Sequence, residues 1–157
     1  MSKEPDNTRR RHTGHSRGPT RANLGFELAK ASQCWNELLS EAFAAHGFPE
    51  VQPRYGSVLL PLFEEDGLRL GEIAARSRLS KQTITTLVSR VTAAGLARRK
   101  DDPSDGRATR IELTPRATEF APVAGDVVHG LERLVEARLS EEECRALRIG
   151  LRTVMEL

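Results

Sequence analysis

The sequence predicts a mainly helical protein with a small antiparallel wing of two or three strands. Three observations lead to this fold class. Apolar side chains recur at three- and four-residue steps along much of the 157-residue chain. Capping residues and glycines divide these runs into separate helices. One polar, turn-rich stretch, residues 101–106, lies between two short segments that fit strands better than helices.

The length and composition suit one globular domain with an appendage. Hydrophobic residues make up 38% of the chain and charged residues 29%. The longest apolar runs are only a few residues, so we expect no membrane-spanning helix, and the polar, basic start does not resemble a secretory signal. The two cysteines are far apart and make neither a disulfide framework nor a zinc site. We therefore expect a cytoplasmic protein without a metal or a cofactor.

The first elements are an arm and a helix. Residues 1–22 carry six basic and two acidic side chains and no large aliphatic residue apart from Met1, so they predict a basic flexible arm. From Asn23 the pattern becomes helical, and Asn23 can cap a first helix that continues to about residue 46. Gly47 can end it.

The middle of the chain predicts three helices and a hairpin. The apolar pattern of residues 55–66 indicates a helix that Pro61 should kink or shorten. A short helix at about 70–76, a turn at 77–79 and a helix from Lys81 to about Ala94, capped by Ser80, come next. The two strands are then expected at residues 96–100 and 109–113, on either side of the turn-rich tip.

Two further helices complete the prediction. Thr114 caps a long helix over residues 115–139 with proline at its first position, and Ser140 opens a capping box for the last helix. These two helices and the first one carry wide apolar stripes that a lobe of this size cannot cover. We therefore expect residues 23–46 and 115–157 to form the interface of a homodimer.

Basic charge is concentrated in the segment that contains the Lys81–Ala94 helix. Residues 81–116 carry eight basic and four acidic side chains, and no Asp or Glu occurs between Ile73 and Lys100. Solvated helices normally mix both signs of charge. An acid-free basic stretch is typical of a surface that binds a polyanion.

The order of helix, tight turn, helix and hairpin over about residues 53–113 predicts a winged helix-turn-helix. In that arrangement the second helix enters the DNA major groove. One face of this helix is apolar, and the other offers short hydrogen-bonding side chains and cations that can contact base edges and phosphates. The candidate DNA-binding residues of this helix are Ser80, Lys81, Gln82, Thr83, Thr85, Thr86, Ser89 and Arg90.

Two more observations support this surface. The β-branched run Thr83-Ile84-Thr85-Thr86 disfavours a helix by roughly 2 kcal/mol, and such local inconsistencies are expected at functional sites. In the hairpin, Arg107 and Arg110 are candidate contacts to the minor groove. Asp105 lies two residues before Arg107 and is expected to orient its guanidinium.

Six segments, taken in order, resemble the MarR family of bacterial regulators. They are Leu70-Gly-Glu-Ile-Ala, Leu79-Ser-Lys-Gln-Thr-Ile-Thr, Leu87-Val-Ser-Arg-Val, Ala94-Gly-Leu-Ala-Arg-Arg, Asp102-Pro-Ser-Asp-Gly-Arg and Ile111-Glu-Leu-Thr-Pro. The resemblance covers about residues 23–157 and is strongest across 53–116. It implies a homodimer that places two winged lobes on a pseudo-palindromic operator in double-stranded DNA. It also implies a repressor, often released by a small phenolic or lipophilic ligand.

The resemblance carries over to particular residues. The arginine of the family's Asp-x-Arg motif in the wing falls on Arg107, and the recognition helix falls on residues 80–94. Thr86 stands where many members have arginine, so the base preference of those members does not transfer.

Other interpretations stay open at this stage. Trp35, His46 and Tyr55 are candidates to line a ligand pocket, although core packing suits Trp35 and Tyr55 better. Cys34 offers redox sensing, although cysteines on packed helices are more often buried and inert. A winged helix that binds protein instead of DNA would need an exposed apolar patch on its second helix. No catalytic motif stands out, so we do not expect an enzyme.

Overall fold

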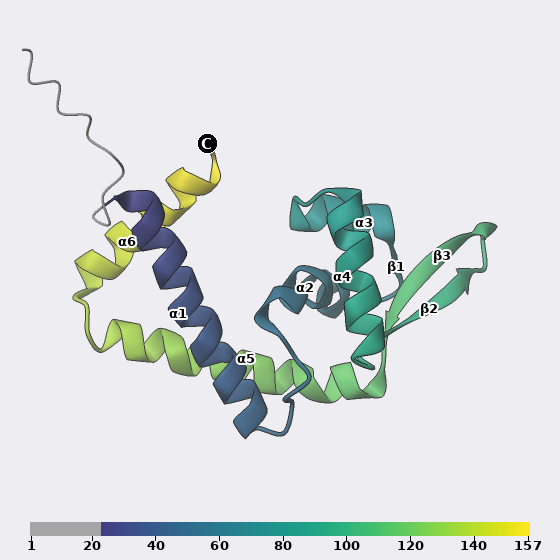
Figure 1. The fold of residues 1–157 in the computed structure, drawn as a ribbon, viewed down its shortest axis with the longest axis horizontal. Helices are drawn as coiled ribbons and strands as arrows, with labels where there is room; N and C mark the ends of the chain where they lie inside the picture. The colour runs from purple at the N-terminus through teal and green to yellow at the C-terminus, as the bar shows by residue number, and fades with distance from the viewer. Residues whose placement is uncertain (1–22) are drawn as a thin grey trace, which may run out of the picture. The chain divides into compact units, whose positions relative to one another are not determined.

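The computed structural model describes residues 23–157, and the predicted basic arm, residues 1–22, lies outside the described residues. The mainly helical class with a small antiparallel sheet is confirmed (Figure 1). The elements in chain order are α1 (Leu24–Ala45), the 3₁₀ turn η1 (Pro53–Tyr55), α2 (Gly56–Glu64), β1 (Leu68–Arg69), α3 (Leu70–Ser77), α4 (Lys81–Ala93), β2 (Ala97–Asp102), β3 (Asp105–Leu113), α5 (Pro115–Glu136) and α6 (Glu141–Met155).

The chain divides into two units, residues 1–33 and 34–157. In the described part of the first unit, Asn23 caps α1 as predicted, because its Oδ1 accepts a hydrogen bond from the amide of Phe26 at 2.9 Å. The winged lobe and the helices that follow it belong to residues 34–157.

Three predicted helix starts are confirmed by hydrogen bonds. Ser80 Oγ accepts from the amide of Thr83 at 3.1 Å, and Thr114 Oγ1 accepts from that of Ala117 at 3.3 Å. Ser140 forms the predicted capping box with Glu143. To act as this cap, Ser140 takes an extended conformation, so α5 ends at Glu136, three residues before its predicted end.

Pro61 remains inside α2 because the adjacent helix compensates for its missing amide. A residue with an amide at this position would donate to the carbonyl of Ser57, four residues back. That carbonyl instead accepts from the hydroxyl of Ser77 at the end of α3. The same contact joins α2 to α3.

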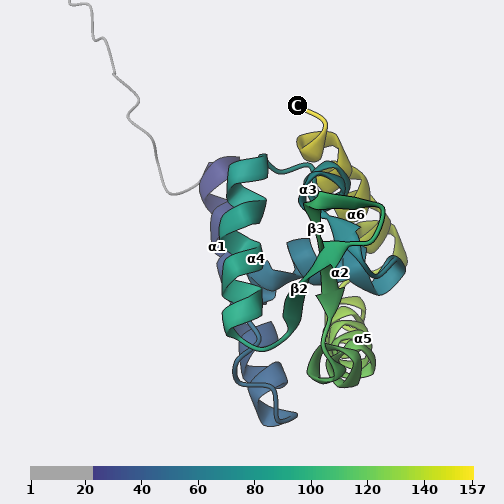
Figure 2. The ribbon, with the colours of Figure 1, turned by 90° about the vertical axis from the view of Figure 1, so that its right-hand side faces the viewer.

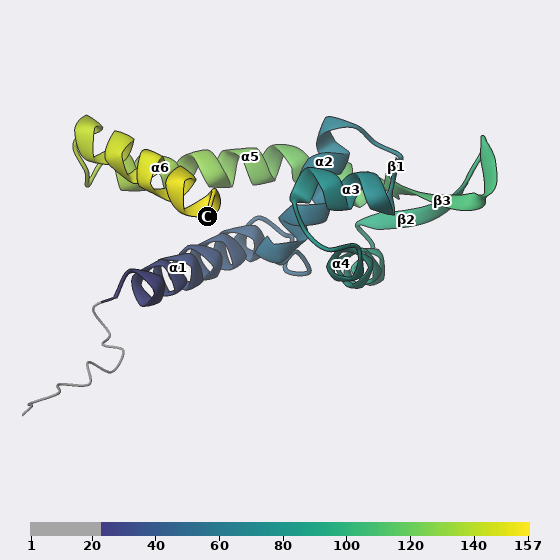
Figure 3. The same cartoon turned by 90° about the horizontal axis from the view of Figure 1, so that it is seen from above.

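The sheet has the order β1-β3-β2, and both pairs of strands are antiparallel. The strands extend further into the tip than predicted, so the hairpin turn consists of Pro103 and Ser104 alone. Asp102 explains the short turn, because its Oδ1 accepts from the amide of Ser104 at 2.9 Å and from the hydroxyl of Ser104 at 2.7 Å. A register shift between Asp101 and Asp102 accompanies it. Seen from above, the hairpin extends away from α2, α3 and α4 (Figure 3).

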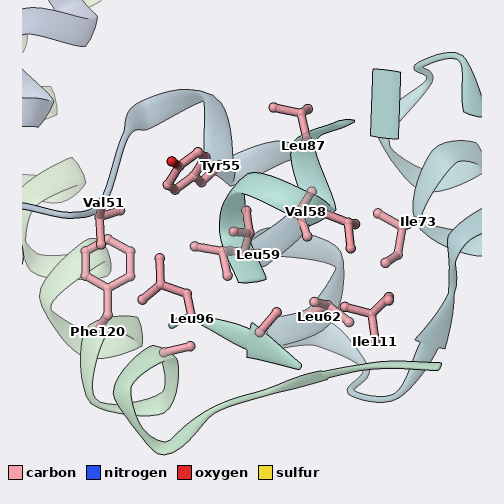
Figure 4. Packing of buried hydrophobic residues seen from close by; sticks show 14 of the residues in the cluster. Val51, Tyr55, Val58, Leu59, Leu62, Ile73, Leu87, Leu96, Ile111 and Phe120 are labelled. Atoms are coloured by element: carbon pink, nitrogen blue, oxygen red, sulfur yellow. The ribbon is translucent and has the colours of Figure 1, made fainter. Parts of the chain in front are cut away.

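The core of the winged lobe is made by side chains from α2, α3, α4, β3 and α5, which point toward one another (Figure 4). Its largest completely buried members are Leu59, Leu62, Ile73, Ile84, Leu96, Ile111, Val58, Val88 and Val91. At roughly 1.5–3 kcal/mol for each such side chain, their removal from water is the main force that holds α4 against the lobe.

An aromatic cluster anchors the beginning of α5. The ring of Phe120 packs edge-on against Phe43 at 4.9 Å between centroids, and tilted against Phe48 at 5.2 Å. The guanidinium of Arg116 lies 4.0 Å from the centroid of the Phe48 ring and forms an ion pair with Glu50 at 2.7 Å. This bond lowers the pKa of Glu50. The end of α1 and the loop after it are thereby fixed to α5.

No helix within residues 23–157 combines the length and the apolar character needed to cross a bilayer.

The turn between α3 and α4 contains a residue in an unfavourable backbone conformation. Arg78 has φ 53° and ψ 36°, and it is the only non-glycine residue with positive φ in the described part of the chain. Glycine adopts this conformation without the clash of a Cβ atom. We expect Arg78→Gly to raise the free energy of unfolding by up to about 1 kcal/mol, measured by urea denaturation. Ala75→Gly, inside α3, is the matched control and should lower it by about 1 kcal/mol. A lower stability of Arg78→Gly would contradict the strain.

Candidate nucleic-acid interface

Helix α4 has the two faces that the sequence predicts. Its buried residues are Ile84, Leu87, Val88 and Val91. The candidate DNA-binding residues from Ser80 to Arg90 are all exposed, and neither Asp nor Glu occurs in α4. Figure 1 shows the base of the β2–β3 hairpin next to one end of α4, with its tip directed away from the helix. Figure 2 shows the same two elements from the side of the wing. A polar, acid-free helix and a hairpin therefore occupy neighbouring positions on one lobe.

Three exposed hydroxyl groups of α4 are hydrogen-bonded to the backbone of their own helix. Thr85, Thr86 and Ser89 each donate to the carbonyl four residues back, at 2.8, 3.2 and 3.0 Å. The hydroxyl of Thr83 bonds that of the cap Ser80 at 2.8 Å. Back-bonding of this kind does not itself stabilise a helix. Burial of the apolar stripe therefore holds the β-branched run in a helix.

The back-bonding also changes what the helix offers to a partner. A hydroxyl whose proton points to its own backbone presents oxygen lone pairs, and a threonine adds a methyl group. Side-chain donors on the exposed face then come from Lys81, Gln82 and Arg90. Oxygen acceptors, methyl groups and a few donors are the complement of the edges that bases display in the major groove.

The basic side chains of the wing divide between its two faces. Glu112 on β3 pairs with Arg98 at 3.0 Å and with Lys100 at 3.1 Å, both on β2. These two cations lower the pKa of Glu112. Strand alternation places Arg99, between them, on the opposite face. Arg99 has no carboxylate partner within residues 23–157, so its charge is not balanced by a direct neighbour there.

The base of the wing is organised around Asp102, whose side chain has no exposed surface. Its Oδ2 accepts from Nε of Arg69 at 2.7 Å and lies 3.0 Å from Nε of Arg110, while its Oδ1 is bonded by Ser104. The bonds from Ser104, followed by those from the two guanidinium groups, hold the pKa of Asp102 well below its usual range. In turn Asp102, with smaller contributions from Asp105 and Glu72, raises the pKa of Arg69.

This network joins three parts of the lobe. Arg69 is the last residue of β1 and the N-cap of α3, Asp102 lies at the end of β2, and Arg110 lies in the middle of β3. Arg110 also donates to the carbonyl of Gly67 at 3.0 Å. The sequence suggested Arg110 as a DNA contact, and its guanidinium is held by groups of the protein itself. Arg107 lies in β3, and its side chain is outside the described part of the structure.

An open cleft of about 560 Å³ lies between the wing and the starts of α3 and α4. Its cations are Arg69, Lys81 and Arg99, and its one carboxylate is Glu72, which accepts from the amide of Arg69 at 2.7 Å. The uncharged residues that line it are Leu70, Gly71, Ala108 and Thr109. Arg69, Arg99 and Asp102 were not among the residues predicted from the sequence, although the alternation of Arg98, Arg99 and Lys100 along one strand was available as a signal.

The structure does not bring the other candidate residues to this cleft. Tyr55 is buried in the core and Trp35 packs against it, as the packing interpretation expected. His46 is exposed, with its Nδ1 2.7 Å from the carbonyl of Ala42. Cys34 is exposed and Cys144 is half-buried, which differs from the buried cysteines that packed helices usually contain.

Known proteins share both the sequence pattern and the fold of this lobe. A family model described as MarR family matches residues 51–108. The HTH-type transcriptional regulator TtmR of Methylorubrum extorquens (strain PA1) is 35% identical over 95 residues, which are 60% of this chain and 47% of that protein. The chain thus spans about half the length of this curated relative. The segment matched by the family model contains α3, α4 and most of the wing. Over residues 51–108 the chain therefore matches the MarR family.

Two solved structures share this MarR fold. The PcaV transcriptional regulator from Streptomyces coelicolor, in complex with its natural ligand, has a TM-score of 0.71 at 23% identity, covering 88% of this chain and 96% of that one. The transcriptional repressor CouR, bound to a 23-mer DNA duplex, has a TM-score of 0.70 at 23% identity, covering 88% and 99%. At these identities the likeness concerns the fold.

The Asp102 network predicts a pH-dependent contribution to stability. Because the folded pKa of Asp102 is depressed, its contribution is present above the unfolded value of about 3.9 and is lost as the pH falls through the folded value. Asp102→Asn should therefore lower the melting temperature near neutral pH, and the difference from the wild type should shrink below about pH 4. Thermal unfolding monitored by circular dichroism from pH 2 to 7 measures both. The exposed neighbour gives the control Asp101→Asn, which should melt like the wild type. A difference independent of pH would contradict the role of the charge.

Proposed function

We propose that this protein is a homodimeric transcriptional regulator that binds a pseudo-palindromic site in double-stranded DNA and represses transcription there. The observation that carries the proposal is the exposed, acid-free face of α4 beside a basic wing. On this lobe α4 would lie in the major groove and the wing, through Arg107, would reach the adjacent minor groove. CouR, which shares this fold, was solved bound to a DNA duplex, and this supports DNA as the partner.

The residues that would read sequence are a subset of the exposed face. Gln82 can bond adenine bidentately, and Thr85 and Thr86 present acceptors and methyl groups to base edges. Lys81 and Arg90 are suited to phosphates or guanine. Ser80 and Thr83 are bonded to each other at the start of the helix, so we assign them the positioning of α4.

A second copy of the chain is the partner that we propose for α6. None of its fifteen residues is buried in the single chain, although Cys144, Leu147, Leu151 and Val154 form one apolar stripe. Leu147 is 46% exposed and Leu151 41%, and Leu134 on α5 is 52% exposed. An amphipathic helix is stable when its apolar face is covered. A two-fold dimer would cover it and would place two lobes about one helical turn of DNA apart, roughly 34–36 Å.

We further propose that a small phenolic or lipophilic ligand releases the DNA. The support is the fold that this chain shares with PcaV, which was solved with its natural ligand. Trp35, His46 and Tyr55 remain the residues proposed for such a pocket, and Tyr55 would have to move out of the core to take part. Cys34, exposed on α1, keeps a redox-sensing variant of the same regulator as the alternative.

A winged helix that binds protein instead of DNA is less consistent with this surface. It would need an exposed apolar patch on α4. The large hydrophobic side chains that are exposed within residues 23–157 lie on other elements.

The proposal is tested by fluorescence anisotropy on duplex DNA from upstream of the protein's own gene, beside a shuffled duplex, at two salt concentrations. The wild type should discriminate between them by about 10³ or more. Gln82→Ala should fold normally and lose about 1–3 kcal/mol of discrimination between the operator and a mismatched site. Thr118→Ala, which removes an exposed, back-bonded hydroxyl from α5 outside this face, is the control and should keep the wild-type discrimination. Equal, weak binding to both duplexes that disappears with salt would contradict a sequence-specific regulator.

The dimer is tested by charge on the stripe of α6. Leu151→Glu should convert the dimer to monomer and weaken operator binding at least tenfold, because burying an unpaired carboxylate opposes association. Analytical ultracentrifugation gives the oligomeric state. Ile149→Glu adds the same charge outside the stripe, at a residue 57% exposed, and should remain dimeric. A dimeric Leu151→Glu protein would contradict this interface.

A further inference from the structure

We propose that the cleft between the wing and the starts of α3 and α4 receives a phosphate of the DNA backbone, held by Arg99 and Lys81. The proposal rests on the regulatory function above and adds Arg99, which neither the resemblance nor the related proteins assign. The cleft would be a positioning site that sets where the lobe sits on the duplex.

The cleft lies where a DNA strand would pass. Lys81 is the first residue of α4, and Arg99 lies on β2 of the wing. When α4 occupies the major groove and the wing approaches the neighbouring minor groove, one sugar-phosphate strand separates the two grooves. That strand has to cross the surface between α4 and the wing, and the cleft lies on this surface. A backbone phosphate is therefore the anion that reaches it by geometry.

The charges of the cleft favour an anion. Lys81 on α4 and Arg99 on β2 line it with cations unpaired in the described part of the chain, against the single carboxylate of Glu72. Glu72 is engaged with the amide of Arg69 in a capping box. Within residues 23–157 neither Lys81 nor Arg99 forms an ion pair, whereas the neighbouring Arg98 and Lys100 are both paired with Glu112. The wing thus neutralises its cations on one face and leaves Arg99 unneutralised on the face of the cleft.

The experiment compares two arginines that differ by one position on the same strand. Arg99→Gln removes the cleft cation, and Arg98→Gln removes an equal charge from the opposite, paired face. With the operator duplex, Arg99→Gln should reduce the slope of log K against log salt by about 0.9 for each phosphate that is no longer neutralised, hence about 1.8 for a dimer. The affinity should fall on the order of tenfold near physiological salt, with the ranking of mismatched sites unchanged. Arg98→Gln should keep the wild-type slope, Arg99→Lys should restore it, and Lys81→Gln should reduce it in the same way as Arg99→Gln.

Neutral methylphosphonate linkages, placed singly along the operator, identify the phosphate. At one linkage in each half-site, on the strand between the two grooves, the penalty of Arg99→Gln should disappear. If the wild type is specific but Arg99→Gln and Arg98→Gln have equal slopes, or if no linkage abolishes the penalty, the cleft does not hold a backbone phosphate. If no linkage abolishes the penalty, the melting temperature is measured with inorganic phosphate. A rise for the wild type and none for Arg99→Gln would assign the cleft to a free anion. If the wild type shows no specific binding to any duplex, the proposed function and this site fail together.

Discussion

The burial of one apolar stripe on α4 is the constraint on which the rest of the lobe depends. Ile84, Val88 and Val91 have no exposed surface and Leu87 very little, so the rotation of the helix about its own axis is fixed by the core. Every polar residue at the intervening positions is then directed outward. The side chains of the outer face contribute little to packing α4 on the lobe. Their types can therefore be selected for binding a partner. This explains how a helix with an unfavourable β-branched run is retained.

The wing shows how a small sheet controls its charges. A pair of antiparallel strands brings cations and carboxylates opposite one another, and here Glu112 balances two of the three cations of β2. The buried carboxylate of Asp102 balances part of the charge at the base and ties the wing to α3. Such a buried group is favourable when its lone pairs are all used, and Ser104 supplies the bonds that the arginines leave. The hairpin therefore has a defined direction relative to α4, which a two-sided contact with DNA requires.

The helices outside the lobe differ in how far their apolar side chains are covered. The first half of α5 is fixed by Phe120 and Arg116 against the end of α1 and the loop that follows. The stripe of α6 has no comparable cover within the single chain. The proposed second copy of the chain would cover this stripe. In that proposal, DNA binding and assembly lie at opposite ends of α5.

The sequence by itself determined the elements whose signals are local. The caps Ser80, Thr114 and Ser140, the buried stripe of α4 and the exposed, acid-free face opposite it all follow from spacing and residue type, and each is found in the structure. Tertiary structure alone decided the contacts between residues distant in sequence. The meeting of Arg69, Asp102 and Arg110, the carbonyl of Ser57 beside Ser77, and the separation of Arg99 from its paired neighbours depend on strand register and helix packing. A single sequence specifies these contacts only through the global fold. Bringing two distant residues together costs conformational entropy, and one contact is too weak to offset that cost by itself.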